Sequence, residues 1–282
     1  MILWIFPGQP LQYAQPEKTG DDLLAIDQLC RDRCGYDLLS RQPLPGHVVS
    51  SHSCLQLHGV AMSLYQARIL RREGLAPQLV AEHSLGLYAA LTACGCIGEG
   101  DALELAGRFG ACMSGMGEHR QYALGCPTGL TCDKVETIAR NNGVYVANYN
   151  TSRHFLLAGS QTGIEAALDE CRSAGAFSVS CFPCEAPLHT PLMEEIGCKL
   201  EEIVKDFTIS QPQIPLVEHI GQTRLTRDVI AEFLVQELCR PVYWEKTWLY
   251  LRSTGFSRCM EVGSGQALSK LNRWIESEQT PS

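Results

Sequence analysis

Apolar residues recur along the chain in two alternating patterns, which together predict a sheet covered by helices. Short apolar runs, typical of buried strands, occur at residues 2–6, 77–81, 214–219 and 258–262. Between them lie longer stretches in which apolar residues recur every three or four positions, and residues 48–70 form the longest. This second spacing predicts helices. Strands that alternate with helices favour a parallel sheet with helices on both faces, an α/β fold.

The middle of the chain has a different order of elements. Its predicted elements are a strand at 122–126, a helix at 132–141, strands at 144–150 and 155–159, a helix at 162–175 and a strand at 177–182. The order β-α-β-β-α-β is that of a ferredoxin-like unit. We therefore predict a small subdomain at residues 119–187, inserted into a core formed by residues 1–118 and 188–282.

The remaining predicted helices belong to that core. They are residues 21–34, 48–70, 88–93, 101–116, 192–209, 227–239, 244–254 and 266–277.

Residues 79–91 join a predicted strand to a predicted helix through a turn that carries a serine. The apolar run ends at Glu82, the turn holds Ser84 and Gly86, and apolar residues at helical spacing follow. This is the layout of a nucleophile elbow, which exposes the serine Oγ and leaves the next N–H at a helix N-terminus. The same layout is also typical of a turn with a capping serine. Elbows usually have glycine where this chain has Glu82.

Composition argues against several classes of protein. The net charge is -8 with no run of lysine and arginine, which argues against binding nucleic acid. No apolar run reaches the roughly 18 residues of a membrane helix. Residues 1–8 lack the basic region of a signal peptide. The 14 cysteines form no paired C-x-x-C motifs, so we expect no metal site, reduced thiols and a cytoplasmic location.

Six short motifs occur in a fixed order along the chain. They are Phe-Pro-Gly-Gln at 6–9, Glu-His-Ser-Leu-Gly at 82–86, Val-Ala-Asn-Tyr-Asn at 146–150, His-Thr-Pro-Leu-Met at 189–193, Leu-Cys-Arg-Pro-Val-Tyr-Trp at 238–244 and Glu-Val-Gly-Ser-Gly at 261–265. Together they resemble the malonyl-CoA:acyl carrier protein transacylase family across almost the whole chain. The resemblance implies an α/β-hydrolase-like parallel-sheet core with an inserted ferredoxin-like subdomain.

The resemblance also assigns roles to particular residues. Ser84 would be the nucleophile, and His189 would be the general base and acid, because a serine hydroxyl needs a neighbouring base. Outside its motif, His189 would be interpreted as a structural histidine. A backbone carbonyl would orient the histidine. The N–H groups of Gln9 and Leu85 would form the oxyanion hole. An acyl-CoA would yield an acyl-serine and then an acyl carrier protein thioester, with no cofactor beyond the CoA substrate and no metal.

The remaining site residues implied by the resemblance would bind substrate. They are His83, Arg108, Phe109, Asn148, Asn150 and Glu237.

Two departures from the family concern the acyl group. The arginine that pairs with the malonyl carboxylate in the family is Phe109 here. Arg108 precedes it, but neighbouring helical residues point about 100° apart, so it is either a surface residue or a substitute. Glu237 replaces a glutamine, and a carboxylate there would oppose an anionic acyl group. These departures favour an uncharged acyl group, although malonyl is the family default.

Two alternative functions use the same residues. A hydrolase would pass the acyl group from Ser84 to water. A carrier-protein-binding subunit would have lost catalysis through distortion of the elbow by Glu82. We expect a monomer whose partners are an acyl-CoA and a carrier protein, with neither nucleic acid nor membrane.

Overall fold

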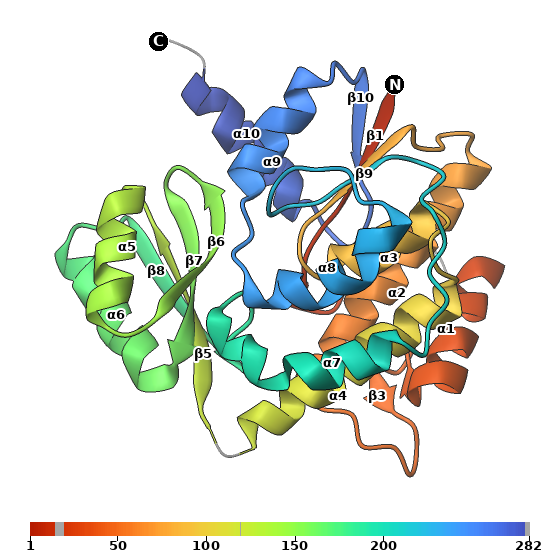
Figure 1. Cartoon of the computed structure of the whole chain (residues 1–282), viewed down its shortest axis with the longest axis horizontal. Coiled ribbons are helices and arrows are strands. Elements are labelled where there is room, and N and C mark those ends of the chain that lie inside the picture. The colour runs from red at the N-terminus through yellow and green to blue at the C-terminus, as the bar shows by residue number, and fades with distance from the viewer. Residues whose placement is uncertain (15–19, 119, 280–282) are drawn as a thin grey trace.

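Four short strands form a parallel sheet at the centre of the large domain. The computed structural model describes residues 1–14, 20–118 and 120–279, and the strand order in this sheet is β10-β1-β4-β9. β1 pairs in parallel with β10 and β4, and β4 pairs in parallel with β9. Figure 1 shows this sheet surrounded by helices. The predicted parallel-sheet core is therefore confirmed.

The elements of the large domain come from both ends of the chain. The strands are β1 (Ile2–Phe6), β2 (Tyr36–Asp37), β3 (Gln42–Pro43), β4 (Leu79–Glu82), β9 (Leu216–Val217) and β10 (Arg258–Glu261). The helices are α1 (Asp21–Cys34), α2 (Ser51–Arg72), α3 (Gly86–Ala93), α4 (Glu99–Gly117), the 3-10 helix η1 (Pro191–Ile196), α7 (Gly197–Val204), α8 (Arg227–Cys239), α9 (Trp244–Ser253) and α10 (Ala267–Gln279).

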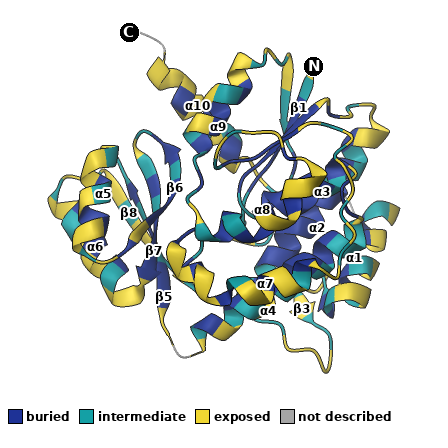
Figure 2. Cartoon of the chain, viewed as in Figure 1, coloured by how far each residue is buried: buried dark blue, intermediate teal, exposed yellow. Residues whose placement is uncertain are grey.

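Alternate residues of the central strands enter two separate cores, because side chains along a strand point to opposite faces. On β1, Trp4 and Phe6 join a large core with α1, α2, α3 and α4, whereas Leu3 and Ile5 join a smaller core with α9 and α10. Figure 2 shows the sheet and α2 largely buried. Helices therefore cover both faces, as the apolar runs predict. Within the described ranges, no helix is long and apolar enough to cross a membrane.

The small subdomain is an antiparallel sheet with two helices on one face (Figure 1). Its elements are β5 (Tyr122–Thr128), α5 (Cys132–Asn141), β6 (Tyr145–Thr151), β7 (His154–Ser160), α6 (Gln161–Ser173) and β8 (Ser178–Cys184). The strand order is β6-β7-β5-β8 with every neighbouring pair antiparallel. This arrangement confirms the ferredoxin-like prediction. A separate apolar core lies between this sheet and its helices.

The prediction of one long helix at residues 192–209 is wrong. The structure has η1 and then α7, which ends at Val204. Beyond it, the N–H groups of Ser210 and Gln213 donate to the carbonyls of Cys96 and Cys94, which follow the last residue of α3. These bonds hold residues 205–213 as a loop against α3.

One prediction about a strand needs correction, and one pair of strands was not predicted. The strand expected at residues 214–219 is paired only at Leu216–Val217, because the Glu218 carboxylate accepts the N–H groups of Ile220, Gly221 and Thr223 and turns the chain. The two-residue strands β2 and β3 form an antiparallel hairpin that the apolar pattern did not predict.

Candidate active site

Ser84 lies on a sharp turn between β4 and α3. Its φ of 54° is in the left-handed region, which side chains other than glycine rarely adopt. Gly86 lies two residues further along the chain. A Cβ at this position would lie 2.3 Å from the Phe6 carbonyl oxygen, so the turn packs directly against the end of β1. Strain of this kind persists only where surrounding structure holds it, and it is typical of functional sites.

Ser84 and His189, 105 residues apart in the chain, form a hydrogen-bonded pair. Ser84 Oγ lies 2.6 Å from His189 Nε2, and His189 Nδ1 lies 2.8 Å from the Glu237 backbone oxygen. A carbonyl only accepts, so Nδ1 carries the hydrogen and Nε2 is free to accept the serine proton. The backbone carbonyl expected to orient the histidine is thus that of Glu237. Burial lowers the pKa of His189 to about 3, which keeps it neutral and able to act as a base.

The two predicted oxyanion-hole residues lie on segments next to this pair. Leu85 precedes the first turn of α3, where backbone N–H groups have no partner within the helix. Gln9 follows β1, and its side chain accepts from Gln56 Nε2 at 3.2 Å and approaches His52 Nδ1 at 3.4 Å. Among the described residues, the N–H groups of Gln9 and Leu85 have no hydrogen-bond partner. Both are available to an oxyanion.

His83, Asn148 and Asn150 form a buried group where the small subdomain meets the elbow. His83 Nε2 lies 3.1 Å from Asn150 Oδ1 and 3.4 Å from Asn148 Nδ2. Asn148 also forms an isolated bridge with Val242 of the large domain. Burial lowers the pKa of His83 to about 4, so the group is uncharged. These contacts join the two lobes beside Ser84.

The structure does not bring Arg108 to Ser84. Its guanidinium lies 2.6 Å from the Asp206 carboxylate just beyond α7, and it stacks over the Phe207 ring at 5.6 Å. Phe109 points inward instead, is fully buried, and packs edge-on against Tyr88 of α3 at 6.2 Å. Two neighbouring residues of α4 therefore have different surroundings, since Arg108 forms a surface ion pair and Phe109 lies in the core. The expectation that Arg108 replaces the missing arginine lacks a geometric basis.

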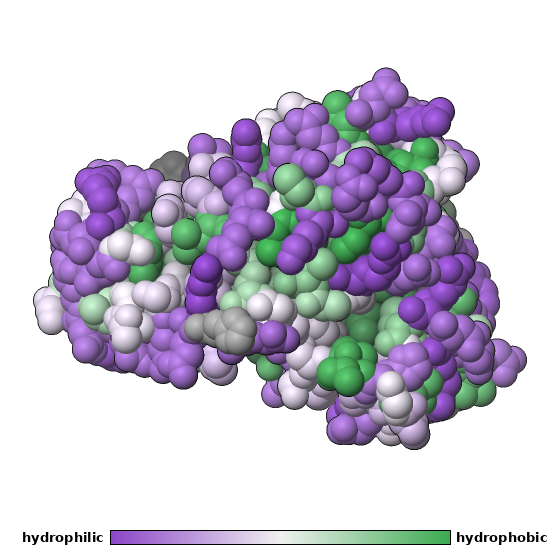
Figure 3. Space-filling model, turned by 60° about the horizontal axis from the view of Figure 1, so that its bottom comes forward, coloured by the Kyte–Doolittle hydropathy of each residue, from purple (hydrophilic) through white to green (hydrophobic). Residues whose placement is uncertain are grey.

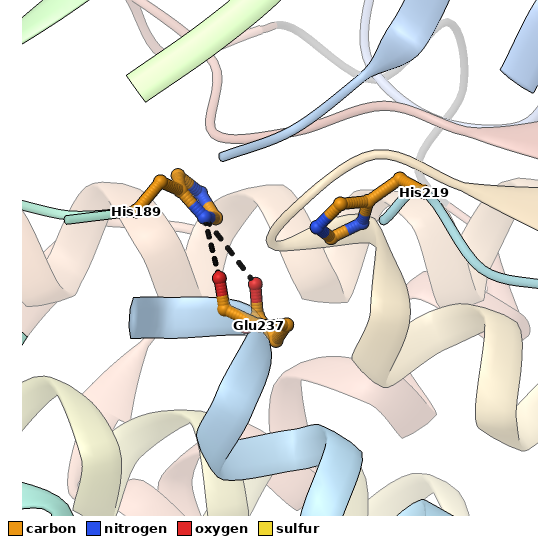
Figure 4. A group of neighbouring side chains, drawn as sticks. All are labelled: His189, His219 and Glu237. Carbon is orange, nitrogen blue, oxygen red and sulfur yellow. Dashed lines mark hydrogen bonds and ion pairs between the residues drawn. The ribbon is translucent and has the colours of Figure 1, made fainter. Parts of the chain in front are cut away.

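Glu237 lies behind His189 and not on the side of Ser84. Its carboxylate Oε2 is 3.6 Å from His189 Nδ1, whereas Ser84 meets the Nε2 edge of the ring. The expectation that Glu237 faces the acyl group is corrected by this placement. Figure 4 shows Glu237 close to His189 and beside a second histidine, His219.

His219 and Glu82 form a buried pair that the sequence did not reveal. His219 Nδ1 lies 2.8 Å and 2.9 Å from the two Glu82 carboxylate oxygens, and both side chains are fully buried. Glu82 therefore leaves the elbow sideways, toward the neighbouring strand, and does not crowd it. The position of His219 in the chain was the signal that could have indicated this pair. His219 follows β9, which lies beside β4 in the sheet, so it meets Glu82, the last residue of β4, at one edge of the sheet.

His189, His219 and Glu237 each place one possible metal-binding atom within 4.8 Å of the others. Both nitrogens of His189, however, already have hydrogen-bond partners in Ser84 and the Glu237 carbonyl. A metal ion there would have to displace one of these bonds. The three residues are therefore buried polar side chains next to Ser84, and His219 Nε2 and Glu237 Oε2 have no hydrogen-bond partner among the described residues.

A different cavity lies away from this pair, among α1, α2, α4 and the start of the small subdomain. Its volume is about 850 Å³, and it is lined by residues such as Arg33, His47, Ser53, Glu104 and Glu185. Figure 3 views the molecule from this side, with apolar side chains gathered around a hollow. Neither Ser84 nor His189 lines it.

Comparison with known proteins places this site in a family. The model of the acyl transferase domain matches residues 21–266. The malonyl CoA-acyl carrier protein transacylase of Salmonella typhimurium is 30% identical over 256 residues, which cover 88% of this chain and 82% of that protein.

Two solved structures share the whole fold. The malonyl CoA-acyl carrier protein transacylase of Coxiella burnetii superposes with a TM-score of 0.88 at 26% identity, covering 98% of this chain and 91% of that one. A malonyl-transacylase in complex with a type II polyketide synthase acyl-carrier protein gives a TM-score of 0.89 at 25% identity, covering 98% and 93%.

Proposed function

Because the chain belongs to the acyl transferase domain family, we propose that it moves an acyl group from a coenzyme A thioester to the thiol of an acyl carrier protein. The observation that carries this proposal is the 2.6 Å hydrogen bond between Ser84 Oγ and His189 Nε2, on an elbow whose next N–H is free. The relatives named above, one of them solved with a carrier protein, support the choice of acceptor.

In the first half-reaction, Ser84 Oγ attacks the thioester carbonyl carbon while His189 Nε2 takes its proton. The oxyanion that forms lies toward the N–H groups of Gln9 and Leu85, and loss of one such donor typically costs about 2.7–4 kcal/mol. The C–S bond then breaks, the CoA thiolate takes the proton from His189, and an acyl-Ser84 ester remains. The carrier thiol reverses these steps. No cofactor beyond the CoA substrate takes part.

We further propose that the acyl group is uncharged. The family position for a carboxylate-binding arginine holds the buried Phe109, and the neighbouring Arg108 is already paired with Asp206. A bidentate arginine–carboxylate contact is strong and specific, so its loss removes a main reason to prefer malonyl.

The first experiment measures the intact mass of the protein after incubation with malonyl-, acetyl-, hexanoyl- and benzoyl-CoA. We expect an uncharged acyl adduct that is absent in Ser84→Ala and moves to a phosphopantetheinylated carrier protein when one is added. CoA release without an adduct or a carrier product would instead mean that water is the acceptor.

The second experiment tests the acyl group separately. The test variant is Arg108→Ala, and the matched control is Arg33→Ala on α1. Each variant removes a surface arginine that is paired with acidic residues. We expect both variants to load each acyl group at the wild-type rate. A tenfold loss of malonyl loading in Arg108→Ala alone would refute the uncharged-acyl proposal.

The partners and location follow from the same proposal. Acyl-CoA is the donor, the carrier protein is the acceptor, and the enzyme acts as a single chain. A cytoplasmic location is supported by 14 thiols, none of which forms a disulfide.

A further inference from the structure

Three buried side chains next to Ser84 bring possible metal ligands together. One ring nitrogen of His189, one of His219 and one carboxylate oxygen of Glu237 lie within 4.8 Å of one another, and each residue is at most 3% exposed. His219 Nε2 and Glu237 Oε2 have no hydrogen-bond partner in the part of the chain that the structure describes. Buried polar atoms are normally paired, so these two need an explanation.

The three ligand atoms are close enough to hold one ion. Atoms that lie no more than 4.8 Å apart share a point within about 2.8 Å of all three (4.8 Å divided by √3). Zinc binds histidine nitrogen at about 2.0–2.1 Å and carboxylate oxygen at about 2.0–2.2 Å, so each atom has to move inward by about 0.8 Å at most. Figure 4 shows Glu237 beneath the space between the two histidines.

The other nitrogen of each histidine is held as in a metal site. His219 Nδ1 lies 2.8 Å and 2.9 Å from the two carboxyl oxygens of Glu82, which leaves Nε2 for another partner. His189 Nδ1 lies 2.8 Å from the Glu237 backbone oxygen. A histidine that binds a metal through one nitrogen usually donates the hydrogen on the other to a carboxyl or carbonyl oxygen. The hydrogen bonds that support a metal-binding histidine are therefore already present.

The chemistry of these donors selects the metal. Two imidazoles and one carboxylate are a common ligand set for Zn²⁺, which takes a water molecule in its fourth position. Mg²⁺ and Ca²⁺ prefer sites built from oxygen atoms. The lack of paired cysteine motifs does not bear on this site, because none of its ligands is a cysteine.

We propose that His189, His219 and Glu237 bind Zn²⁺, and that the bound ion inhibits acyl transfer. In the structure, His189 Nε2 faces Ser84 and Nδ1 faces the Glu237 carbonyl. An ion on Nε2 occupies the lone pair that takes the Ser84 proton. An ion on Nδ1 moves the ring hydrogen to Nε2, which then cannot accept. Either geometry removes the base, and Glu237 binds as the carboxylate after giving any proton it holds to solvent.

This inference rests on the proposed roles of Ser84 and His189, but not on the identity of the acyl group. One nitrogen lone pair cannot bind zinc and accept the serine proton at the same time, so the ion and the reaction compete for His189. Removal of the ion by a chelator therefore restores the base. The ion is an inhibitor and not a cofactor of the transfer.

The first test measures how Zn²⁺ changes the rate at which a fluorophosphonate labels Ser84, which requires the base but no particular acyl group. The ligand variants are His219→Gln and Glu237→Gln, and the second of these keeps the carbonyl that orients His189. The matched controls are His47→Gln and Glu232→Gln, both at exposed positions. Each protein is incubated with the ion until its rate is constant, because the site is buried, and is compared with its own rate in EDTA.

We expect saturating Zn²⁺ to slow labelling of the wild type about tenfold or more, and EDTA to reverse the effect. The zinc concentration that halves the rate should rise about tenfold in each ligand variant and stay at the wild-type value in both controls. Mg²⁺ at the same concentrations should leave the rate unchanged, because the donors are mostly nitrogen.

A second readout identifies the ligands without any reaction at Ser84. Co²⁺ replaces Zn²⁺ in such sites and absorbs visible light in a way that depends on its ligands. We expect the wild-type spectrum minus that of His219→Gln to show tetrahedral Co²⁺ without the near-ultraviolet band of a thiolate ligand. This difference removes the contribution of ions bound at the free cysteines.

Three results would overturn the zinc site: labelling that Zn²⁺ does not slow, equal inhibition of the wild type and both ligand variants, or a thiolate band in the difference spectrum. If His219→Gln does not fold, Glu237→Gln takes its place in both measurements. A wild-type chain that the probe cannot label in EDTA would instead overturn the roles of Ser84 and His189, and with them the proposed function.

Discussion

At the scale of single residues, the neutral state of His189 determines the pH range of the reaction. Burial, together with His219 and His83 nearby, lowers the pKa of His189 to about 3, far below the usual 6.5. A base with that pKa stays unprotonated on acidification to pH 5. We therefore expect the rate of Ser84 labelling to be constant between pH 8 and 5. A sigmoidal loss centred near pH 6.5 would contradict this prediction.

Gly86 gives a second prediction at the same scale. A Cβ at this position would lie 2.3 Å from the Phe6 carbonyl oxygen, which is backbone and cannot rotate away. We expect Gly86→Ala to lower the free energy of unfolding by about 2 kcal/mol, as overpacking usually does, and to abolish labelling of Ser84. Urea denaturation measures the first effect.

Gly197 offers the control for that change. It lies at the start of α7 with helical dihedral angles, and an added Cβ would meet nothing within 4 Å. Gly197→Ala should leave labelling unchanged and stabilise the protein by about 0.4–1 kcal/mol. Equal losses in both variants would mean that the contact with Phe6 is unimportant.

At the scale of elements, the sequence predicts helices well where apolar spacing and end signals agree. The bounds of α1, α5 and α8 match the predicted residues 21–34, 132–141 and 227–239. The long helix predicted at 192–209 was wrong because carbonyls just after α3, distant in the sequence, accept hydrogen bonds from the loop that follows α7. No local pattern predicts a hydrogen bond between residues as far apart in the sequence as Ser210 and Cys96.

The residues of the candidate site also differ in whether the sequence alone could identify them. Ser84 and His189 lie in short motifs, so the sequence sufficed to name them. His219 and Glu82 meet only because β4 and β9 are neighbours in the sheet, which depends on strand order. The positions of the Arg108 and Phe109 side chains depend on the rotation of α4 about its axis. This rotation brings Arg108 to Asp206 and Phe109 into the core.

The cap of α2 allows a prediction for an element. The Ser50 hydroxyl accepts the Ser53 N–H at 3.0 Å and also donates to the Glu185 carboxylate at 2.7 Å, just after β8. Ser160 caps α6 by accepting the Gly163 N–H at 3.2 Å. Loss of a serine cap costs about 1 kcal/mol. We expect Ser50→Ala to cost more than Ser160→Ala in urea denaturation, because it also leaves Glu185 with one donor fewer.

At the scale of the whole molecule, the two lobes meet through polar contacts beside the reactive pair. Asn150 of the small subdomain holds His83 of the elbow, and Asn148 bridges to Val242 just before α9. Ser50 ties the start of α2 to Glu185 at the other end of the small subdomain. The insert therefore contacts the core at two places, at His83 beside Ser84 and at the start of α2.

Buried histidines make the stability of the whole molecule depend on pH. Burial lowers the pKa of His58 and His83 to about 4, whereas an unfolded histidine titrates near 6.5. Below pH 6.5 the unfolded chain binds protons that the folded chain refuses, so this stability is present above pH 6.5 and is lost as the pH falls toward 4. Each histidine should cost about 2 kcal/mol between pH 6.5 and 5.

His58 is the residue with which to measure this loss, because it lies outside the reactive site and its Nε2 accepts only the Ala14 N–H at 3.2 Å. His58→Gln keeps an acceptor but removes the titration, so the free energy of unfolding should fall less steeply between pH 6.5 and 5 than in the wild type. His47→Gln, at an exposed position, is the control and should keep the wild-type slope. Parallel slopes for all three proteins would show that His58 titrates alike in the folded and unfolded chain, and that its burial carries no cost in acid.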